Sequence, residues 1–283
     1  MVVLLIARVL RVVLVARAGR PARGAQRPSP VSGREPHGTA RGHAGVMIDA
    51  WTAAQIRAAE KPHLDAGEPL MQRAADGLAE VVRDMLRAST ASREGRPGRV
   101  LLLVGSGNNG GDALFAGAAL AHEIVPAGGA VTVVAAGSHL HEAGLAAALA
   151  AGATRDELAG WCDPGAVSER LPRHHVVLDG LVGTGSSGAG LRGDARRVVE
   201  ALLPSLGRPV APEVVAVDIP SGLDPDDGSV ADDVVLPADV TVTFGGCKAG
   251  LLRGRGPALA GRIVLIDIGI GADLAGLARE ESE

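Results

Sequence analysis

Short apolar runs recur along the second two-thirds of the chain. They occupy residues 99–104, 130–136, 174–178, 213–217, 239–244 and 262–267. Segments with apolar positions at helical spacing lie between several of these runs, at about 113–124, 141–151 and 192–203. Apolar strands that alternate with helices are typical of a mostly parallel sheet covered by helices on both faces. The pattern therefore predicts an α/β fold, a three-layer αβα sandwich.

Two more helices are predicted before the first of these strands. Thr52 is a suitable N-cap for a helix that extends to about Ala66, and Gly67 ends this helix. Pro69 begins a second helix that extends to about Ala88 and carries an apolar stripe on one side.

Composition excludes several classes of protein. The chain has 283 residues, of which 47% are hydrophobic, which is sufficient for one large α/β domain. Two Trp, two Phe and no Tyr argue against a platform on which single-stranded nucleic acid stacks its bases. Cys162 and Cys247 are too few for a disulfide framework or a cysteine-rich zinc site, and they fit a reduced, cytoplasmic setting.

Charge separates the first 46 residues from the rest. They contain eight Arg and one Glu, whereas the whole chain carries −4, so the remainder carries −11. An acidic body is a poor surface for nucleic acid. Arginines interrupt the apolar stretch 1–18, which argues against a membrane span and a secretory signal but leaves a basic surface helix over 2–18 open. We predict a disordered basic extension or mis-assigned start over 1–46, one domain over 47–275 and a frayed tail over 276–283.

Three loops carry polar side chains where a predicted strand ends. Residues 105–112 read Gly-Ser-Gly-Asn-Asn-Gly-Gly-Asp, residues 179–188 read Asp-Gly-Leu-Val-Gly-Thr-Gly-Ser-Ser-Gly, and residues 218–224 read Asp-Ile-Pro-Ser-Gly-Leu-Asp. The carboxyl ends of parallel strands meet at one edge of a sheet, where ligands bind. The three loops therefore predict a single pocket, and the glycine-rich first loop is suited to hold a phosphate with backbone N–H groups.

The first loop matches the dinucleotide pattern Gly-x-Gly-x-x-Gly, which is weak on its own. A nicotinamide-dependent oxidoreductase also needs an acidic residue near the end of the second strand to bind the ribose, and residues 131–137 contain none. The chain also lacks the Gly-x-x-x-x-Gly-Lys-Ser/Thr motif of P-loop kinases. Both activities are therefore disfavoured, whereas phosphate binding by backbone amides is not.

Four motifs in sequence order resemble the NAD(P)H-hydrate epimerase family. They are residues 105–112, residues 179–188, Val-Asp-Ile-Pro-Ser-Gly at 217–222, and Ala-Asp-Val-Thr-Val-Thr-Phe-Gly at 238–245 with Lys248, and the similarity runs from about Met47 to Gly271. The resemblance implies a Rossmann-like sandwich that interconverts the R and S forms of NADHX and NADPHX, which carry an added water at C6 of the nicotinamide ring. It also implies a bound potassium ion and a homodimer.

The resemblance assigns roles to individual residues. Asn108, Asn109, Gly110, Gly111 and Asp112 match one substrate-binding loop, and Gly183, Thr184, Gly185, Ser186, Ser187, Gly188 and Ala189 match a second. Asp218 matches an acid that contacts substrate, and Asn109, Asp179 and Ser221 match the side chains that bind potassium. Two departures from the family pattern occur. Ala113 stands where a glycine is common, and Cys247 and Ala249 stand where prolines are common, which weakens any role for Lys248.

The chemistry of epimerisation can be argued from the substrate. The ring nitrogen expels the C6 hydroxyl as water once an acid has protonated it, and water then returns to the other face. The enzyme must supply a group that exchanges this proton and negative charge near the cation. We predict that Asp218 does both, with Asp112 as the alternative proton carrier.

Each of these residues also has a purely structural interpretation. Asp112 is equally suited to cap a helix that begins at Ala113, and Asp218 to bond the backbone of its own turn. Asp179 and Ser221 are suited to satisfy loop amides, and these oxygen ligands alone do not distinguish potassium from magnesium. The same reasoning predicts that Lys248 is solvated or binds a phosphate.

His174 and His175 are predicted to lie at a partly exposed strand start.

The alternative to an epimerase is a non-catalytic domain of the same fold that binds a nucleotide or a partner. The retention of Asp112, Asp179 and Asp218 favours the enzyme. Bifunctional members of the family continue into an ADP- or ATP-dependent dehydratase domain. This chain ends shortly after its last predicted strand, so we expect that activity to be absent or encoded separately.

Overall fold

A computed structural model describes residues 12–17, 49–92, 95–185 and 190–280. Its centre is an eight-stranded sheet with the strand order β1-β10-β8-β7-β6-β3-β4-β5. The strands are β1 (Val12–Arg17), β3 (Arg99–Val104), β4 (Ala130–Ala135), β5 (Thr154–Asp156), β6 (Val176–Gly180), β7 (Glu213–Val217), β8 (Val240–Phe244) and β10 (Arg262–Ile266). Neighbouring strands are parallel apart from β1 and β10, which confirms the predicted sheet.

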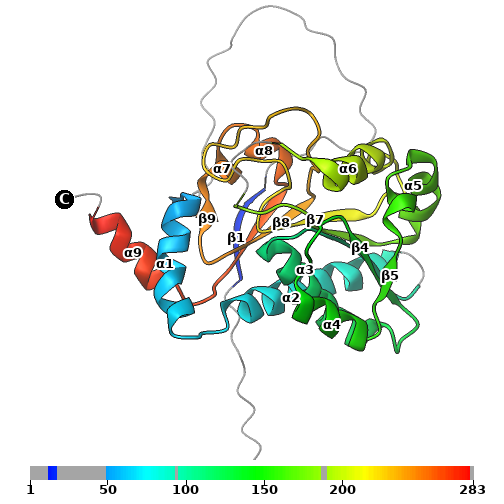
Figure 1. Cartoon of the computed structure of the whole chain (residues 1–283), viewed down its shortest axis with the longest axis horizontal. Coiled ribbons are helices and arrows are strands. Elements are labelled where there is room, and N and C mark those ends of the chain that lie inside the picture. The colour runs from blue at the N-terminus through cyan, green and yellow to red at the C-terminus, as the bar shows by residue number, and fades with distance from the viewer. Residues whose placement is uncertain (1–11, 18–48, 93–94, 186–189, 281–283) are drawn as a thin grey trace, which may run out of the picture.

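Helices cover both faces of the sheet, as Figure 1 shows. They are α1 (Ala53–Asp65), α2 (Leu70–Ser92), α3 (Asn108–Ile124), α4 (Glu142–Ala150), α5 (Pro164–Arg170), α6 (Gly193–Leu206), α7 (Ala249–Leu252), α8 (Gly256–Leu259) and α9 (Gly271–Glu280). Successive residues of a strand point to opposite faces, so Leu102 packs with α2, α3 and α4 while Leu103 packs with α5 and α6. Burial on both faces explains the unbroken apolar runs in the sequence.

The two helices predicted before the first long strand are confirmed. Thr52 caps α1 with a capping box, because its hydroxyl accepts from the Gln55 N–H at 3.2 Å while the Gln55 side chain accepts from the Thr52 N–H at 2.8 Å. Gly67 has φ of 73° just beyond this helix, a conformation that favours glycine. α1 and a two-stranded parallel pair, β2 (Ala50–Trp51) with β9 (Cys247–Lys248), lie beside the edge where the main strands end.

The structure differs from the sequence prediction at both ends of the chain. Val12–Arg17 forms β1 and pairs antiparallel with β10, where we predicted an extension without structure. The interrupting arginines dominated that prediction, although the run Val12–Ala16 is rich in β-branched residues. Residues 1–11 and 18–46 lie outside the described residues. The predicted tail is helical as far as Glu280 in α9, and residues 281–283 are likewise outside the described part.

Topology places a binding site at the ends of β3 and β6. From β3 the chain winds outward to β4 and β5, and it then returns to add β6 on the other side of β3. The loops after β3 and β6 therefore leave the sheet in opposite directions, and a crevice opens between them. The three polar loops predicted from the sequence all leave the sheet at this edge, with the loop after β7 next in line.

Candidate active site

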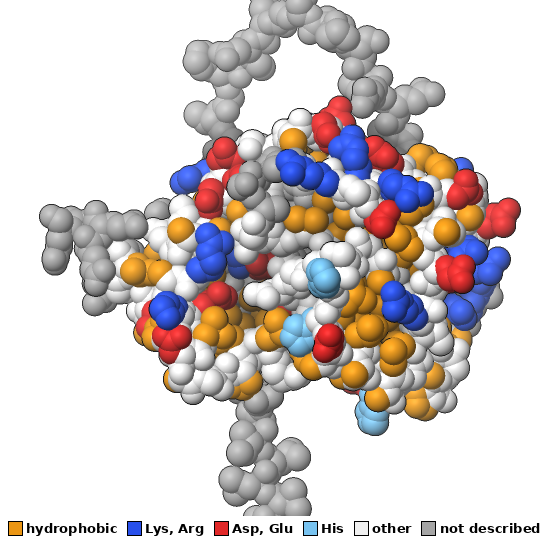
Figure 2. Space-filling view, viewed as in Figure 1, with side chains coloured by type: hydrophobic (Ala, Val, Ile, Leu, Met, Phe, Trp, Pro, Cys, Tyr) orange, Lys and Arg blue, Asp and Glu red, His pale blue; other side chains and the backbone are white. Residues whose placement is uncertain are grey.

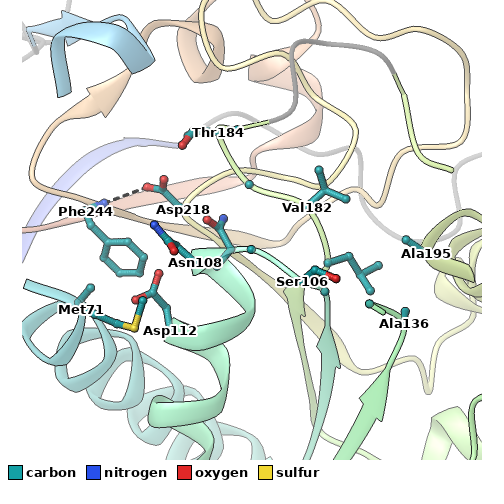
Figure 3. A pocket seen from close by; sticks show the side chains of 18 of the residues that line it. Met71, Ser106, Asn108, Asp112, Ala136, Val182, Thr184, Ala195, Asp218 and Phe244 are labelled. Atoms are coloured by element: carbon teal, nitrogen blue, oxygen red, sulfur yellow. Dashed lines mark hydrogen bonds between the residues drawn. The ribbon is translucent and has the colours of Figure 1, made fainter. Parts of the chain in front are cut away.

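A pocket of about 1000 Å³ lies at this edge of the sheet. Figure 3 shows it as an elongated space, with Asp112, Asp218, Met71 and Phe244 at one end and Ser106, Ala136 and Ala195 at the other. Pockets for small molecules usually measure roughly 300–1,000 Å³. The space is therefore large enough for a ligand with several ring systems.

Close backbone packing shapes the first wall of the pocket. A Cβ atom at Gly105 would lie 1.7 Å from the Leu181 carbonyl oxygen, so the exit of β3 passes directly against the exit of β6. α3 begins at Asn108, directly after this tight turn. Its N-cap is Gly107, which provides no side-chain hydrogen bond. The N–H groups at this helix end therefore face the pocket, where they can bind an anion.

Asp112 is not a helix cap, which corrects one interpretation of the sequence. Because α3 begins at Asn108 and not at Ala113, Asp112 lies in its second turn. The early start was missed because Gly110 and Gly111 are poor helix formers, whereas here they pack against Gly105 and Met71.

Asp112 is 6% exposed and lines the pocket. No group in the described part of the chain donates a hydrogen bond to its carboxyl. Burial first, and the negative charge of Asp218 second, raise the pKa of Asp112 well above its usual range. Asp112 is therefore an acid that retains its proton to a higher pH than an ordinary aspartate does.

Asp218 is held by the neighbouring strand and not by its own turn. Its Oδ1 accepts hydrogen bonds from the Thr243 hydroxyl at 3.0 Å and from the Phe244 N–H at 3.2 Å. Lys248 donates a third, and the two buried side chains form an ion pair. Asp218 also has φ of 68°, which directs its side chain across β8 toward the pocket (Figure 3).

The prediction that Lys248 is solvated is wrong. Lys248 is 2% exposed, and its ammonium group also donates to the Phe244 carbonyl oxygen at 3.0 Å. A charge buried this deeply requires a partner, and Asp218 provides it. The departures from the family pattern at positions 247 and 249 therefore do not remove Lys248 from the site.

Glu60 is a pocket residue that the sequence analysis did not identify. It reaches the pocket from α1, and burial raises its pKa while the nearby charge of Lys248 opposes that rise. The position of Glu60 in the sequence was the signal that could have identified it. Glu60 follows buried Ile56 by four residues, so a carboxylate stands on the face of α1 that packs inward. Arg57 and Arg192 also line the pocket without having been predicted.

Asp179 and Ser221 lie beneath the pocket, both 0% exposed. The Ser221 hydroxyl donates to Asp179 at 2.6 Å, and Asp179 also accepts the N–H groups of Ser221 at 2.9 Å and Leu181 at 3.3 Å. These bonds satisfy loop amides, as the structural interpretation expected. Burial nevertheless raises the pKa of Asp179 to about 6, and no Lys, Arg or His among the described residues pairs with it.

Asn109 joins this buried pair to the pocket. Its amide nitrogen donates to the Val217 carbonyl oxygen, and its Oδ1 faces Gly183, where a Cβ atom would lie only 2.1 Å away. Gly183 must therefore be glycine for the second loop to lie over Asn109. The structure thus brings Asn109, which lines the pocket, together with Asp179 and Ser221, which lie beneath it.

The predicted substrate-binding residues fall into three groups. Asn108, Asn109, Asp112, Gly183, Thr184, Gly185 and Asp218 line the pocket. Gly110 and Gly111 are buried behind it in α3 and do not line it. Ser186, Ser187, Gly188 and Ala189 lie outside the described residues.

The prediction of a partly exposed strand start at His174 and His175 is wrong. They are 7% and 3% exposed, and the Nδ1 atom of His175 accepts the Arg99 N–H at 3.0 Å. Both lie at the opposite end of β6 from the pocket. The described residues contain no cluster of three His, Cys, Asp or Glu side chains positioned to hold a metal ion.

Surface charge on the described part of the chain is mixed. Figure 2 shows basic side chains interspersed with acidic ones on the face that is viewed in Figure 1. Within the described ranges no helix combines the length and apolar character that a membrane crossing requires.

Comparison with protein families gives a match to the model described as YjeF-related protein N-terminus. The match covers residues 67–250, which is more than half of the chain and includes the three polar loops that follow β3, β6 and β7.

Named relatives match over most of the chain. An NAD(P)H-hydrate epimerase of Clavibacter michiganensis is 48% identical over 82% of this chain and 94% of its own length. One from Microbacterium testaceum is also 48% identical, over 79% of each. The bifunctional NAD(P)H-hydrate repair enzyme Nnr of Mycobacterium tuberculosis is 40% identical over 78% of this chain but only 41% of its own length.

A solved structure supports the fold. The crystal structure of the yeast protein ynu0 superposes with a TM-score of 0.59 at 20% identity, covering 72% of this chain and 83% of that one. The Rossmann-like three-layer architecture predicted from the sequence is thereby confirmed.

Proposed function

The chain belongs to the family of YjeF-related N-terminal domains, and we infer from this premise that it is an NAD(P)H-hydrate epimerase. It is an isomerase of metabolite repair that interconverts the R and S forms of hydrated NADH and NADPH. The observation that carries this function is the nearly full-length similarity to named epimerases. Nothing favours a non-catalytic binding domain, because the pocket retains Asp112 and Asp218.

The two ends of the pocket indicate how the substrate lies. We propose that the hydrated nicotinamide ring occupies the end that contains Asp112 and Asp218, because its reaction passes through a cation. The pyrophosphate then lies at the N-terminus of α3, next to Gly107 and Asn108. The loop after β6, with Gly183, Thr184 and Gly185, covers the substrate from the other side.

Asp218 is the proposed catalytic residue for the charge that develops on the ring. Loss of the C6 hydroxyl as water leaves a positive charge shared between the ring nitrogen and C6. A carboxylate fixed before the reaction stabilises such a charge without reorganisation. Asp218 meets this requirement, since three donors hold its Oδ1 and its side chain lines the pocket.

The residues below the pocket fit a potassium ion. Asn109, Asp179 and Ser221 present amide, carboxylate and hydroxyl oxygens, which are the donors that hard cations prefer. The supporting observation is the buried carboxylate of Asp179, which has no basic partner in the described part of the chain. A bound cation would supply positive charge there and would hold the loops after β3, β6 and β7 together.

Removal of potassium is expected to lower the melting temperature. A ligand at 100 times its Kd adds about 2.7 kcal/mol, which corresponds to roughly 5–10 °C for a domain of this size. Differential scanning calorimetry in potassium chloride and in choline chloride at equal ionic strength measures the difference. Asp179→Asn should lose the potassium-specific increment, whereas Asp84→Asn on the exposed face of α2 should keep it. Equal melting temperatures of the unmodified protein in both salts would contradict the assignment.

Partners and setting follow from the same proposal. The substrate is a small molecule, and we propose a homodimer that acts in the cytoplasm with a separate ADP- or ATP-dependent dehydratase. Relatives named as bifunctional repair enzymes support a second activity in the same repair, and this chain matches less than half of their length.

The function is tested by separating the two epimers chromatographically. Purified protein is given either pure epimer of NADHX, and both reactions should approach the same mixture faster than without protein. The total of the two epimers should stay constant, because no oxidation, reduction or net dehydration takes place.

A further inference from the structure

The two carboxyl groups at the reactive end of the pocket have opposite surroundings. Asp218 contacts an ammonium group and two other donors through Oδ1. Asp112 accepts no hydrogen bond from the described residues, and it lines the same end of the pocket as Met71 and Phe244 (Figure 3). Two acids in such different environments are suited to different roles in one reaction.

Hydrogen-bond donors and a positive charge surround the Asp218 carboxylate. A positive charge in direct contact and hydrogen bonds from Thr243 and Phe244 all stabilise a carboxylate. A proton on Asp218 would leave the buried ammonium group of Lys248 without a counter-charge. Asp218 is therefore poorly suited to be the group that carries a proton through the reaction.

The surroundings of Asp112 favour its neutral form. The charged groups that act on it are Asp218 at the end of β7, Glu60 on α1 and Lys248 on β9. The two carboxylates oppose a further negative charge, and the ammonium of Lys248 is already engaged by Asp218. No donor among the described residues compensates a charge on the buried Asp112 carboxyl, so a proton on Asp112 is the least costly arrangement.

We propose that Asp112 gives the proton to the departing C6 hydroxyl, and that Lys248 is a positioning residue that keeps Asp218 as the anion facing the cation. This proposal rests on the proposed epimerase function and assigns the proton to Asp112, where the sequence had favoured Asp218. It goes beyond that function because it divides acid catalysis and charge stabilisation between two residues.

The step balances as follows. Asp112 transfers its proton to the C6 hydroxyl oxygen, and the C6–O bond breaks with its electron pair leaving on water. The lone pair of the ring nitrogen forms a double bond to C6. A water molecule then adds to C6 from the other face and releases one proton to the water in the pocket, from which Asp112 regains its own. No electron is gained or lost overall.

The test compares Asp112→Asn with Asp84→Asn, a change at an exposed position of α2. Asp112→Asn should lower kcat by about 10²–10⁴-fold with little change in KM, the usual contribution of a positioned acid. Asp84→Asn should match the unmodified protein. If Asp112→Asn fails to fold by circular dichroism, Asp112→Glu provides the second variant, and it should retain partial activity with an acid still present.

The pH profile distinguishes an acid from a structural residue. In the unmodified enzyme kcat should fall at high pH as Asp112 loses its proton, and Asp112→Asn should lack this fall. Asp218→Asn should keep the fall but at lower pH, because the charge of Asp218 raises the pKa of Asp112. A residue that only supports the fold would not produce this pattern.

Two results would overturn the proposal while leaving the epimerase function intact. One is Asp112→Asn with kcat within about threefold of the unmodified protein. The other is loss of the high-pH fall in Asp218→Asn, which would assign the proton to Asp218. Failure of the unmodified protein to interconvert the epimers is a different outcome, and it would reject the proposed function itself.

Discussion

Asp218→Asn is expected to lower kcat for epimerisation by about 10²–10³-fold, the usual cost of removing one fixed group from a developing charge. The asparagine keeps the size of the side chain but carries no negative charge beside the cation. Lys248 would then face the reacting ring as an uncompensated positive charge. Steady-state rates at saturating NADHX measure the loss, and KM should change much less than kcat.

A double variant separates this catalytic effect from instability. Asp218→Asn leaves Lys248 buried without a counter-charge, so the single variant is also expected to be less stable. Adding Lys248→Met removes the orphaned charge and should restore much of the stability but none of the activity. Recovery of near-normal kcat in the double variant would contradict a role for the Asp218 charge in catalysis.

Lys248→Met is expected to destabilise the fold by about 3–5 kcal/mol, the cost of leaving a buried charge unpaired. The side chains of Lys248 and Asp218 are 3% and 10% exposed, so neither charge is well hydrated. Urea denaturation followed by circular dichroism gives the free energy of unfolding. The midpoint should fall without a change in slope, because the surface exposed on unfolding stays the same.

The chain offers a matched control for this prediction. Lys61 is the other lysine, and it pairs with Asp65 at 2.8 Å on the surface of α1 with a side chain that is 71% exposed. Lys61→Met should cost less than about 1 kcal/mol, since exposed ion pairs contribute little. If Lys248→Met and Lys61→Met lowered the free energy of unfolding by similar amounts, the buried ion pair of Lys248 would contribute no more to stability than the exposed pair of Lys61.

The core of the fold was predictable because its signals are local. The predicted run 99–104 coincides with β3 (Arg99–Val104), since its residues are buried on both faces of the sheet and therefore uniformly apolar. Thr52 likewise begins α1, and Gly67 follows its end, as the chemistry of each residue predicts. The meeting of three polar loops followed from parallel topology alone.

Other features depend on contacts between distant segments. The start of α3 was placed too late because helix propensity disfavours glycine, whereas close packing of Gly105 against Leu181 governs that turn. The burial of Lys248 depends on Asp218, thirty positions away in the chain. The inward position of His174 depends on Trp161, whose ring lies 5.6 Å away. None of these contacts leaves a pattern in the residues around it.

The identity of the site residues came from the resemblance more than from spacing. The residues alone predicted acids and amides at one sheet edge but did not distinguish a cap from a catalyst at Asp112. The structure rejects the cap, since α3 already includes Asn108. Glu60 was not identified as a site residue, although its position on the inward face of α1 was visible in the sequence.

The central claim is that this pocket interconverts the epimers of hydrated nicotinamide nucleotides. The most direct measurement gives the R epimer of NADHX to a dehydratase that accepts only the S form, with and without this protein. The account predicts rapid and complete consumption of the R epimer when the protein is present, and a rate that depends on Asp218. Consumption of the R epimer no faster than in the dehydratase alone would contradict it.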